Sequence, residues 1–196
     1  ATKTYKTNID FRKMHAVRDD ALVTVSSNGD VRLYDNVGGN ARNLIPAQVA
    51  RVPISVDTTQ DGVCILVNYG SKLQLFIARN GPIDLYNSTA RKERKPRPID
   101  LEVNPQFLKN QNLHENSYLW AKFDKNGSKE EFVIAGTKSF VMIWSLSRVL
   151  QGYVESKCVR KVEEGVIVDG EFMSNMKSLL LAYQNKISIH KGNTIV

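Results

Sequence analysis

Cysteine is scarce in this sequence, with only Cys64 and Cys158 among 196 residues. A disulfide-stabilised domain carries more cysteines than this, and a zinc site carries them in closely spaced pairs. Both residues lie in short apolar stretches that are typical of strands. We therefore expect two buried thiols in a reducing compartment, and a cytoplasmic protein.

Long hydrophobic runs are also missing. The longest runs, Val63–Val67 and Leu179–Tyr183, are far shorter than the roughly 20 residues that a membrane-spanning helix needs, so no transmembrane segment is expected. The N-terminus has neither an initiator methionine nor the apolar core of a secretory signal. We interpret the sequence as a piece of a longer protein.

Motifs for catalysis or metal binding are missing as well. His15, His114 and His190 occur singly, whereas a metal site needs three or four converging donors. There is no nucleophile elbow, and Gly38-Gly39 lacks the Lys-Ser/Thr of a phosphate-binding loop. The sequence therefore predicts no enzyme, no metal and no cofactor.

Positive charge is in excess, with a formal net charge of +7 at pH 7, and this favours acidic partners. More than half of the excess comes from one segment in which five cations accompany a single anion. The cations are Arg91, Lys92, Arg94, Lys95 and Arg97. This segment is a solvated loop, a binding loop for an acidic protein, or a loop for nucleic acid or anionic lipid. Nucleic acid is an unlikely partner because Tyr86 is the only aromatic residue nearby for base stacking.

The main pattern is a repeated pair of short strand-like runs joined by a tight polar turn. In the first copy, Asn28-Gly29 separates Ala21–Ser27 from Val31–Asp35, and Asn-Gly is a strong hairpin signal. Three similar hairpins span residues 63–77, 131–146 and 178–190. Each hairpin follows another extended run; these runs are Tyr5–Val17, Val52–Thr58, Tyr118–Phe123 and Val166–Met173. Each unit thus supplies three strands and leaves room for a fourth.

The spacing of these units predicts an all-β fold, a β-propeller of WD-repeat type. The equivalent positions Leu33, Leu75, Ile143 and Ile189 are 42, 68 and 46 residues apart, and propeller blades repeat every roughly 40–50 residues. We place about four blades at residues 1–47, 48–98, 99–160 and 161–196. Residues 1–196 are then either one complete propeller domain or the C-terminal part of a propeller domain. The long middle interval holds an inserted basic loop at about 80–116, within which Pro98–Val103 alternates and rejoins a sheet.

Two further expectations follow from this architecture. Four blades is the smallest number usual in a closed ring, so we expect a part of a larger ring whose open sheet edges pair with other chains, for example by dimerisation. One short helix is expected within Ser145–Gly152, with Ser147 as its N-cap and Gly152 at its end.

One long run of residues carries a family resemblance. The segment Gly29–Pro46 (GDVRLYDNVGGNARNLIP) resembles a signature of the vacuole import and degradation family, specifically of its cytoplasmic member numbered twenty-seven. Shorter matches follow in the same order along nearly the whole chain. They are Ile54–Asp57 with Asp61-Gly62, Lys95–Pro98, and Phe140–Leu146 with Val149-Leu150. The chain departs from the family pattern at Cys64, where the family has tryptophan, and in the inserted residues 106–116.

The resemblance implies a WD-repeat-like propeller in the C-terminal half of a longer cytoplasmic protein. It also connects the chain with vacuolar import and degradation of cytosolic enzymes in fungi. Asp35 and Trp144 stand at equivalent ends of two hairpin strands, where WD repeats have the dipeptide that names them. We expect both residues to serve packing and turn stabilisation.

Two functions are compatible with these features. The first is a non-catalytic scaffold that binds protein partners through connections between fixed strands. The alternative is an electrostatic binder of nucleic acid or anionic membrane that works through the Arg91–Arg97 segment. The two differ in salt dependence, because binding to polyanions weakens steeply as ionic strength rises.

Overall fold

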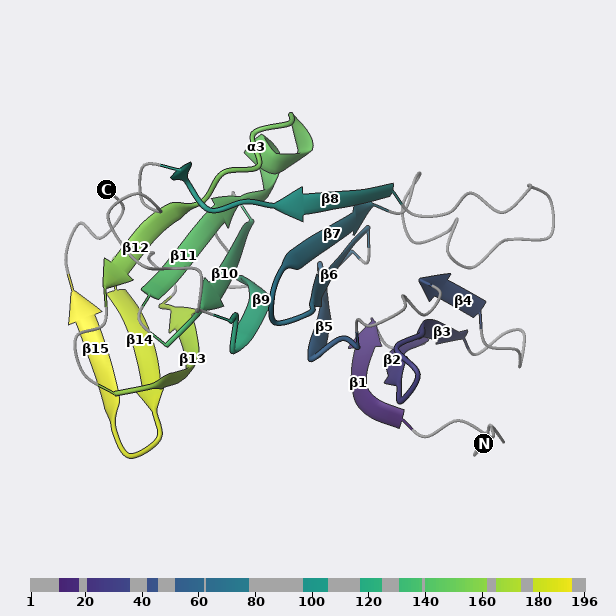
Figure 1. The fold of residues 1–196 in the computed structure, drawn as a ribbon, viewed down its shortest axis with the longest axis horizontal. Helices are drawn as coiled ribbons and strands as arrows, with labels where there is room; N and C mark the ends of the chain where they lie inside the picture. The colour runs from purple at the N-terminus through teal and green to yellow at the C-terminus, as the bar shows by residue number, and fades with distance from the viewer. Residues whose placement is uncertain are drawn as a thin grey trace. The chain divides into compact units, whose positions relative to one another are not determined.

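The computed structural model describes residues 11–17, 21–35, 42–45, 52–61, 63–77, 97–105, 117–124, 131–138, 140–161, 165–173 and 178–191. These residues form four small sheets and one short helix (Figure 1). The all-β prediction is therefore confirmed. The chain divides into two compact units, Ala1–Val67 with Phe76–Pro98, and Asn68–Leu75 with Ile99–Val196.

The first sheet has the order β1-β2-β3-β4 and the second the order β5-β6-β7-β8. The strands of the first sheet are β1 (Phe11–Val17), β2 (Ala21–Ser26), β3 (Val31–Asp35) and β4 (Arg42–Ile45). Those of the second are β5 (Ser55–Thr58), β6 (Cys64–Asn68), β7 (Leu73–Ile77) and β8 (Arg97–Leu101). The prediction that Pro98–Val103 rejoins a sheet is confirmed by β8.

The third sheet has the order β12-β11-β10-β9 and the fourth the order β13-β14-β15, and both are antiparallel. The third sheet contains β9 (Trp120–Asp124), β10 (Phe132–Gly136), β11 (Phe140–Ser145) and β12 (Lys157–Lys161). The fourth contains β13 (Ile167–Phe172), β14 (Ser178–Tyr183) and β15 (Ile187–Lys191). Each predicted hairpin is thus present as a pair of consecutive strands.

The first hairpin shows how local chemistry closes these turns. Gly29 has φ 88°, a left-handed conformation that glycine adopts without strain. Asn28 Oδ1 accepts a hydrogen bond from Asp30 N at 3.1 Å, and Asp30 Oδ2 accepts one from an Arg32 guanidinium nitrogen at 2.8 Å. Ser26 N donates to Asp30 O at 3.0 Å. The turn is therefore held by hydrogen bonds formed within a short stretch of sequence.

The helix α3 (Leu146–Leu150) leaves the end of β11. Its N-cap is Ser145, whose Oγ accepts a hydrogen bond from Arg148 N at 3.4 Å. The prediction that Ser147 is the cap is therefore wrong. The helix starts as soon as the extended strand ends, because Ser145 is still extended (φ −72°, ψ 121°) and already presents a side-chain acceptor.

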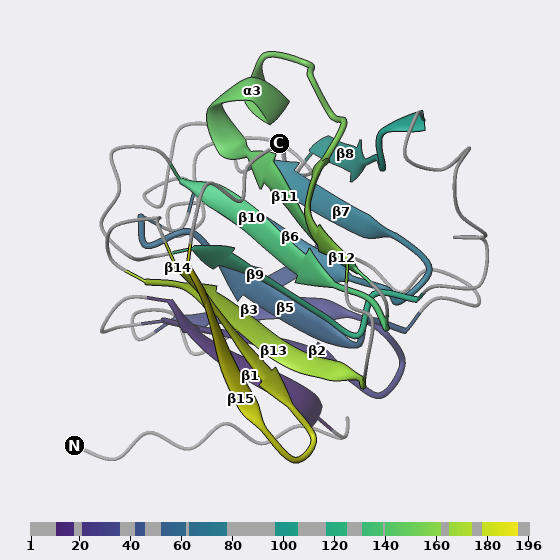
Figure 2. The same cartoon turned by 90° about the vertical axis from the view of Figure 1, so that its left-hand side faces the viewer.

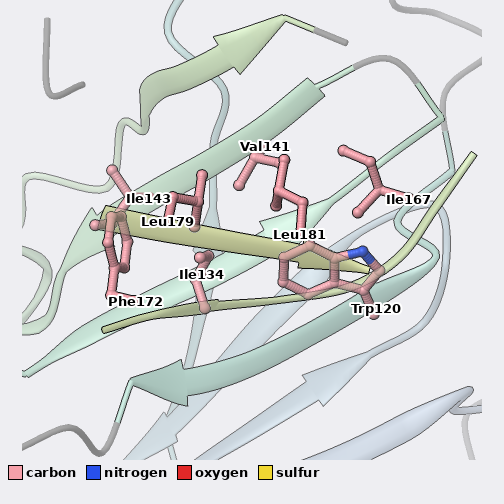
Figure 3. Close-up of a cluster of buried hydrophobic side chains, with 8 residues drawn as sticks. All are labelled: Trp120, Ile134, Val141, Ile143, Ile167, Phe172, Leu179 and Leu181. Atoms are coloured by element: carbon pink, nitrogen blue, oxygen red, sulfur yellow. The ribbon is translucent and has the colours of Figure 1, made fainter. Parts of the chain in front are cut away.

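In the second unit, the third and fourth sheets pack face to face, with β9 and β10 against β13 (Figure 2). Directly opposite residues of an antiparallel pair share a face, so Ile134 on β10 and Ile143 on β11 point the same way. They form part of a buried cluster (Figure 3). Its members are Trp120, Ile134, Val141, Ile143, Ile167, Phe172, Leu179 and Leu181. This cluster is the core between the two sheets.

Trp120 packs between the third and fourth sheets where they approach closely. It lies opposite Gly136 in the β9–β10 register, and its indole ring covers Gly136 and extends to Gly170 on β13. A Cβ atom built on Gly170 would lie 2.7 Å from Trp120 Cη2, and one built on Gly136 would also meet the ring. The close approach of the sheets therefore depends on two glycines that leave space for one tryptophan.

The first unit has its own core. Several apolar residues of the β2–β3 hairpin and of β6 are buried, among them Val23, Val25, Val31 and Ile65. Both β1 and β2 contact β5, so the first sheet packs against the strand that opens the second sheet.

Replacing Gly170 by alanine tests the tryptophan contact. We expect Gly170→Ala to lower the free energy of unfolding by about 1–3 kcal/mol, because the added methyl group overpacks the space under the indole. Urea denaturation measures this loss. In a Trp120→Leu background the same glycine substitution should be much less destabilising, and an equal loss in both backgrounds would contradict the proposed clash.

Candidate functional site

The sequence-predicted site residues fall largely outside the described residues. This holds for Arg91, Lys92, Arg94 and Lys95, whereas Arg97 is the first residue of β8, with only its backbone described. Asp35 ends β3, and its side chain is likewise not among those described. A role for the basic segment in binding stays a prediction.

Trp144 on β11 is fully buried and contacts the segment that follows β8. Its indole Nε1 donates a hydrogen bond to Glu102 O at 2.9 Å. Glu102 N in turn donates to Val154 O at 2.9 Å, and Ser156 N donates to Glu102 O at 2.8 Å. The residues after β8 are thereby held against the connection from α3 to β12.

Tyr118 packs beside Trp144. Its ring meets that of Trp144 edge-on, with centroids 6.3 Å apart and an interplanar angle of 61°. Its backbone N donates to Gly70 O at 2.8 Å, and its carbonyl oxygen accepts from Asn68 Nδ2 at 3.2 Å. Burial raises the pKa of the Tyr118 hydroxyl to about 12. At neutral pH the Tyr118 hydroxyl is therefore uncharged.

The charged turn of the first hairpin is also a structural feature. The hydrogen bond that the Arg32 guanidinium donates to Asp30 raises the pKa of Arg32 above its usual value, against the opposing effect of burial. The guanidinium and the carboxylate are bonded to each other at 2.8 Å. They stabilise the turn.

Neither a metal site nor a membrane span emerges from the described residues. Among them, no three His, Cys, Asp or Glu side chains converge as metal ligands would. None of the helices described there has the length and apolar character needed to cross a bilayer.

Exposed apolar side chains gather on the last sheet. Val168, Met173, Ile187 and Ile189 are all exposed, and Ile187 and Ile189 are 72% and 54% accessible. The β14–β15 register sets Ile189 opposite Leu180 and Ile187 opposite Ala182, so these four share one face. We call Leu180, Ala182, Ile187 and Ile189 the open face. The opposite face, with Leu179 and Leu181, is buried in the core of Figure 3.

The third sheet has no such open face among its described side chains. Its side toward the fourth sheet belongs to the core cluster, and its other side carries Val133, Ala135, Met142 and Trp144, all buried. Such burial on both faces is what stacked propeller blades require. Among the described side chains, the fourth sheet thus differs from the third in having one covered and one open face.

A family model for the VID27 C-terminal WD40-like domain matches residues 1–195. The chain belongs to this family. It is 26% identical over 197 residues to vacuolar import and degradation protein 27 of Schizosaccharomyces pombe, and 22% identical over 204 residues to the protein of the same name from Saccharomyces cerevisiae. The alignments cover 95% and 97% of this chain but 24% and 26% of those proteins. This WD40-like chain thus spans about a quarter of the length of the curated relatives it matches.

Solved propellers share the fold of this WD40-like chain. The β-propeller domain of Cps50 (Swd1) from Myceliophteria thermophila matches with a TM-score of 0.63 at 14% identity, and the WD40 β-propeller domain of Doa1 with 0.59 at 15% identity. The matches cover 94% and 97% of this chain and 54% of each propeller chain. The prediction of a WD-type β-propeller is confirmed, and the four sheets correspond to part of a set of blades.

The open face of this WD40-like chain was not singled out from the sequence. The run Lys186-Ile-Ser-Ile-His190 alternates, which does predict a strand with one apolar side. The same alternation marks strands whose apolar side is covered. The signal was present, but it cannot distinguish a covered face from an open one.

The raised pKa of Tyr118 predicts a pH dependence of stability. An unfolded tyrosine loses its proton near pH 10, whereas the folded one keeps it to about 12, so stability is present below pH 10 and is lost as pH rises from there toward 12. The free energy of unfolding should therefore decline between pH 9 and pH 11, and we expect Tyr118→Phe to reduce this decline by about 1 kcal/mol. Urea midpoints across this range measure the difference.

The exposed Tyr153 provides a matched control for this measurement. Tyr153→Phe should leave the alkaline decline as it is in the parent chain. If both substitutions flatten the curve equally, burial of Tyr118 is not its cause.

Proposed function

We propose that this WD40-like chain is a non-catalytic scaffold that binds protein partners in the cytoplasm. The observation that carries the proposal is the open face on the last sheet, with Ile187 and Ile189 exposed on a strand whose sheet has its other side in a packed core. Apolar side chains grouped on the surface of a folded protein mark interaction sites. A WD40-like fold of small stacked sheets supports such a site rigidly.

The connections between strands support the same function. The first hairpin turn is held by its own side-chain hydrogen bonds, and the segment after β8 is held in place by the hydrogen bond from Trp144 to Glu102. Binding surfaces held this way lose little conformational entropy when a partner docks. A fixed framework therefore suits recognition of a partner surface.

The charge of the chain favours acidic partners. A net charge of +7 accelerates the encounter with an acidic protein, and affinity then depends on the apolar contact. The segment Arg91–Arg97 concentrates this charge and is the proposed source of the steering. Under this proposal, loss of these cations slows association without abolishing binding.

The relatives suggest the pathway. Their shared name, vacuolar import and degradation protein 27, supports a role for this chain as a binding part of a longer protein that acts in that process.

Salt dependence separates this function from polyanion binding. Protein partners captured on the immobilised chain should stay bound between about 50 and 200 mM salt and should also be captured when Arg91, Lys92, Arg94, Lys95 and Arg97 are changed to glutamine. A polyanion held by five phosphate contacts would instead lose about 100- to 500-fold in affinity over this range. Quantitative mass spectrometry of the captured proteins gives the readout.

Two outcomes would overturn the scaffold proposal. One is steep salt-dependent loss of every captured protein together with loss in the glutamine variant. The other is retention of nucleic acid or anionic vesicles in place of proteins, which would establish the electrostatic alternative.

A further inference from the structure

The turn of the first hairpin contains a chemically reactive pair, Asn28-Gly29, to which the scaffold function assigns no role. Asparagine followed by glycine favours this kind of turn. It is also the pair in which the asparagine carboxamide reacts most readily with the backbone, because glycine has no side chain to hinder its nitrogen. Asn28 is exposed, whereas Gly29 and Asp30 are buried. Water therefore reaches the Asn28 side chain, and hydrogen bonding rather than burial has to control its reaction.

The reaction joins the Asn28 side chain to the backbone of the next residue. The Gly29 nitrogen gives its proton to a base in the solvent and attacks Asn28 Cγ, so that an N–Cγ bond forms. The Cγ–Nδ2 bond breaks, and Nδ2 takes up a proton and leaves as ammonia. Water then opens the resulting cyclic imide at either carbonyl group, which leaves aspartate or isoaspartate at position 28. The solvent supplies both the base and the water.

The attacking nitrogen is held in the folded turn. Gly29 N donates a hydrogen bond to Ser26 O at 3.0 Å, and Ser26 N donates one to Asp30 O at 3.0 Å. The proton that the base must remove lies in the first of these bonds, and Gly29 is buried. A buried and bonded amide releases its proton when the local structure opens. The nucleophile is therefore available in the opened hairpin.

The carboxamide under attack is held as well. Asn28 Oδ1 accepts hydrogen bonds from Asp30 N at 3.1 Å and from Ser26 Oγ, and Asn28 Nδ2 donates to Asp30 Oδ2 at 3.0 Å. Arg32 is bonded to the same Asp30 oxygen at 2.8 Å and keeps the carboxylate in place. Attack needs the carboxamide plane to turn so that its carbon faces Gly29 N, and the three bonds of Asn28 resist this rotation.

We propose that Asn28 is a conditional modification site: the folded turn suppresses its deamidation, and opening of the first hairpin releases it. The aspartate product does not restore the turn, because it lacks the Nδ2 donor and sets a second carboxylate beside Asp30. A chain that has been unfolded is thus marked by a lasting negative charge in this turn. The inference is independent of the scaffold function.

Mass spectrometry of the chain after incubation at mildly alkaline pH tests the site. We expect conversion of Asn28 to be at least about tenfold slower in buffer than in urea that unfolds the chain, because only opened hairpins react. Asn80 and Asn126 also precede glycine in the sequence and serve as references in urea. Equal rates at Asn28 in buffer and in urea would overturn the proposal. So would slow conversion of Asn28 relative to both references in urea, since the sequence and not the turn would then protect it.

Two substitutions locate the protection within the chain. Asp30→Ala removes the acceptor of the Asn28 Nδ2 bond and should raise conversion in the folded chain at least about threefold. Gly170→Ala, in the second unit, is the matched control and should leave the Asn28 rate unchanged. Circular dichroism verifies that both variants are folded. An equal rise in both would show that unfolding of the whole chain controls the reaction, which contradicts protection by the turn.

Amide hydrogen exchange gives a test that needs no substitution. Folding should slow exchange of the Gly29 amide and conversion of Asn28 by factors that agree within about tenfold, because both need the opened hairpin. Fast exchange of Gly29 together with slow conversion of Asn28 would refute control by opening, as would slow exchange with fast conversion.

The lasting effect of the reaction is tested with Asn28→Asp, which has the side chain of the aspartate product. Its urea midpoint should lie below that of the parent chain. Ser27→Asp adds the same charge at the exposed neighbouring residue, keeps the bonds of Asn28, and should lower the midpoint less. A midpoint of Asn28→Asp equal to that of the parent would show that the product restores the turn and would refute the lasting mark.

Discussion

The contact of Trp120 with Gly136 and Gly170 is the packing constraint on which the second unit depends. A large indole between two sheets demands that both neighbouring strands carry no side chain where the ring lies, and both provide glycine there. The rest of the cluster, from Ile134 to Leu181, then closes around the ring. An ion pair from Lys122 Nζ to Asp169 Oδ1 at 3.1 Å joins β9 to β13, but exposed ion pairs contribute little free energy compared with this apolar burial.

The fourth sheet packs one face against the third sheet and leaves apolar side chains exposed on its other face. The third sheet is buried on both sides where its side chains are described, whereas β15 alternates between half-buried Ser188 and His190 and exposed Ile187 and Ile189. An amphipathic strand with its apolar side outward is unfavourable in isolation, because exposed apolar area is not removed from water. Under the proposed function, this exposed apolar side is the surface that a partner contacts.

Most of the strands could be predicted from sequence because their causes are local. Asn28-Gly29 closes the first hairpin through its own turn, and alternation in Leu73–Ile77 defines a strand without any distant partner. The prediction of the helix cap failed by two residues, at Ser147 instead of Ser145, because two nearby serines are equivalent in sequence and only the end of β11 chooses between them. The contact of Trp144 with Glu102, 42 residues away in sequence, had no local signal.

The sequence by itself determined the strands, their turns and the repeat that identifies a WD-type propeller, since period-two alternation and turn chemistry act over a few residues. Only the tertiary structure decided which apolar residues are core and which are surface. Leu179 and Leu181 on β14, like Ile187 and Ile189 on β15, are apolar residues two positions apart in a strand. Trp120 and its neighbours from a distant strand cover only the two leucines. Burial depends on what a separate part of the chain brings to a face, and this information is not contained in the alternation of the strand itself.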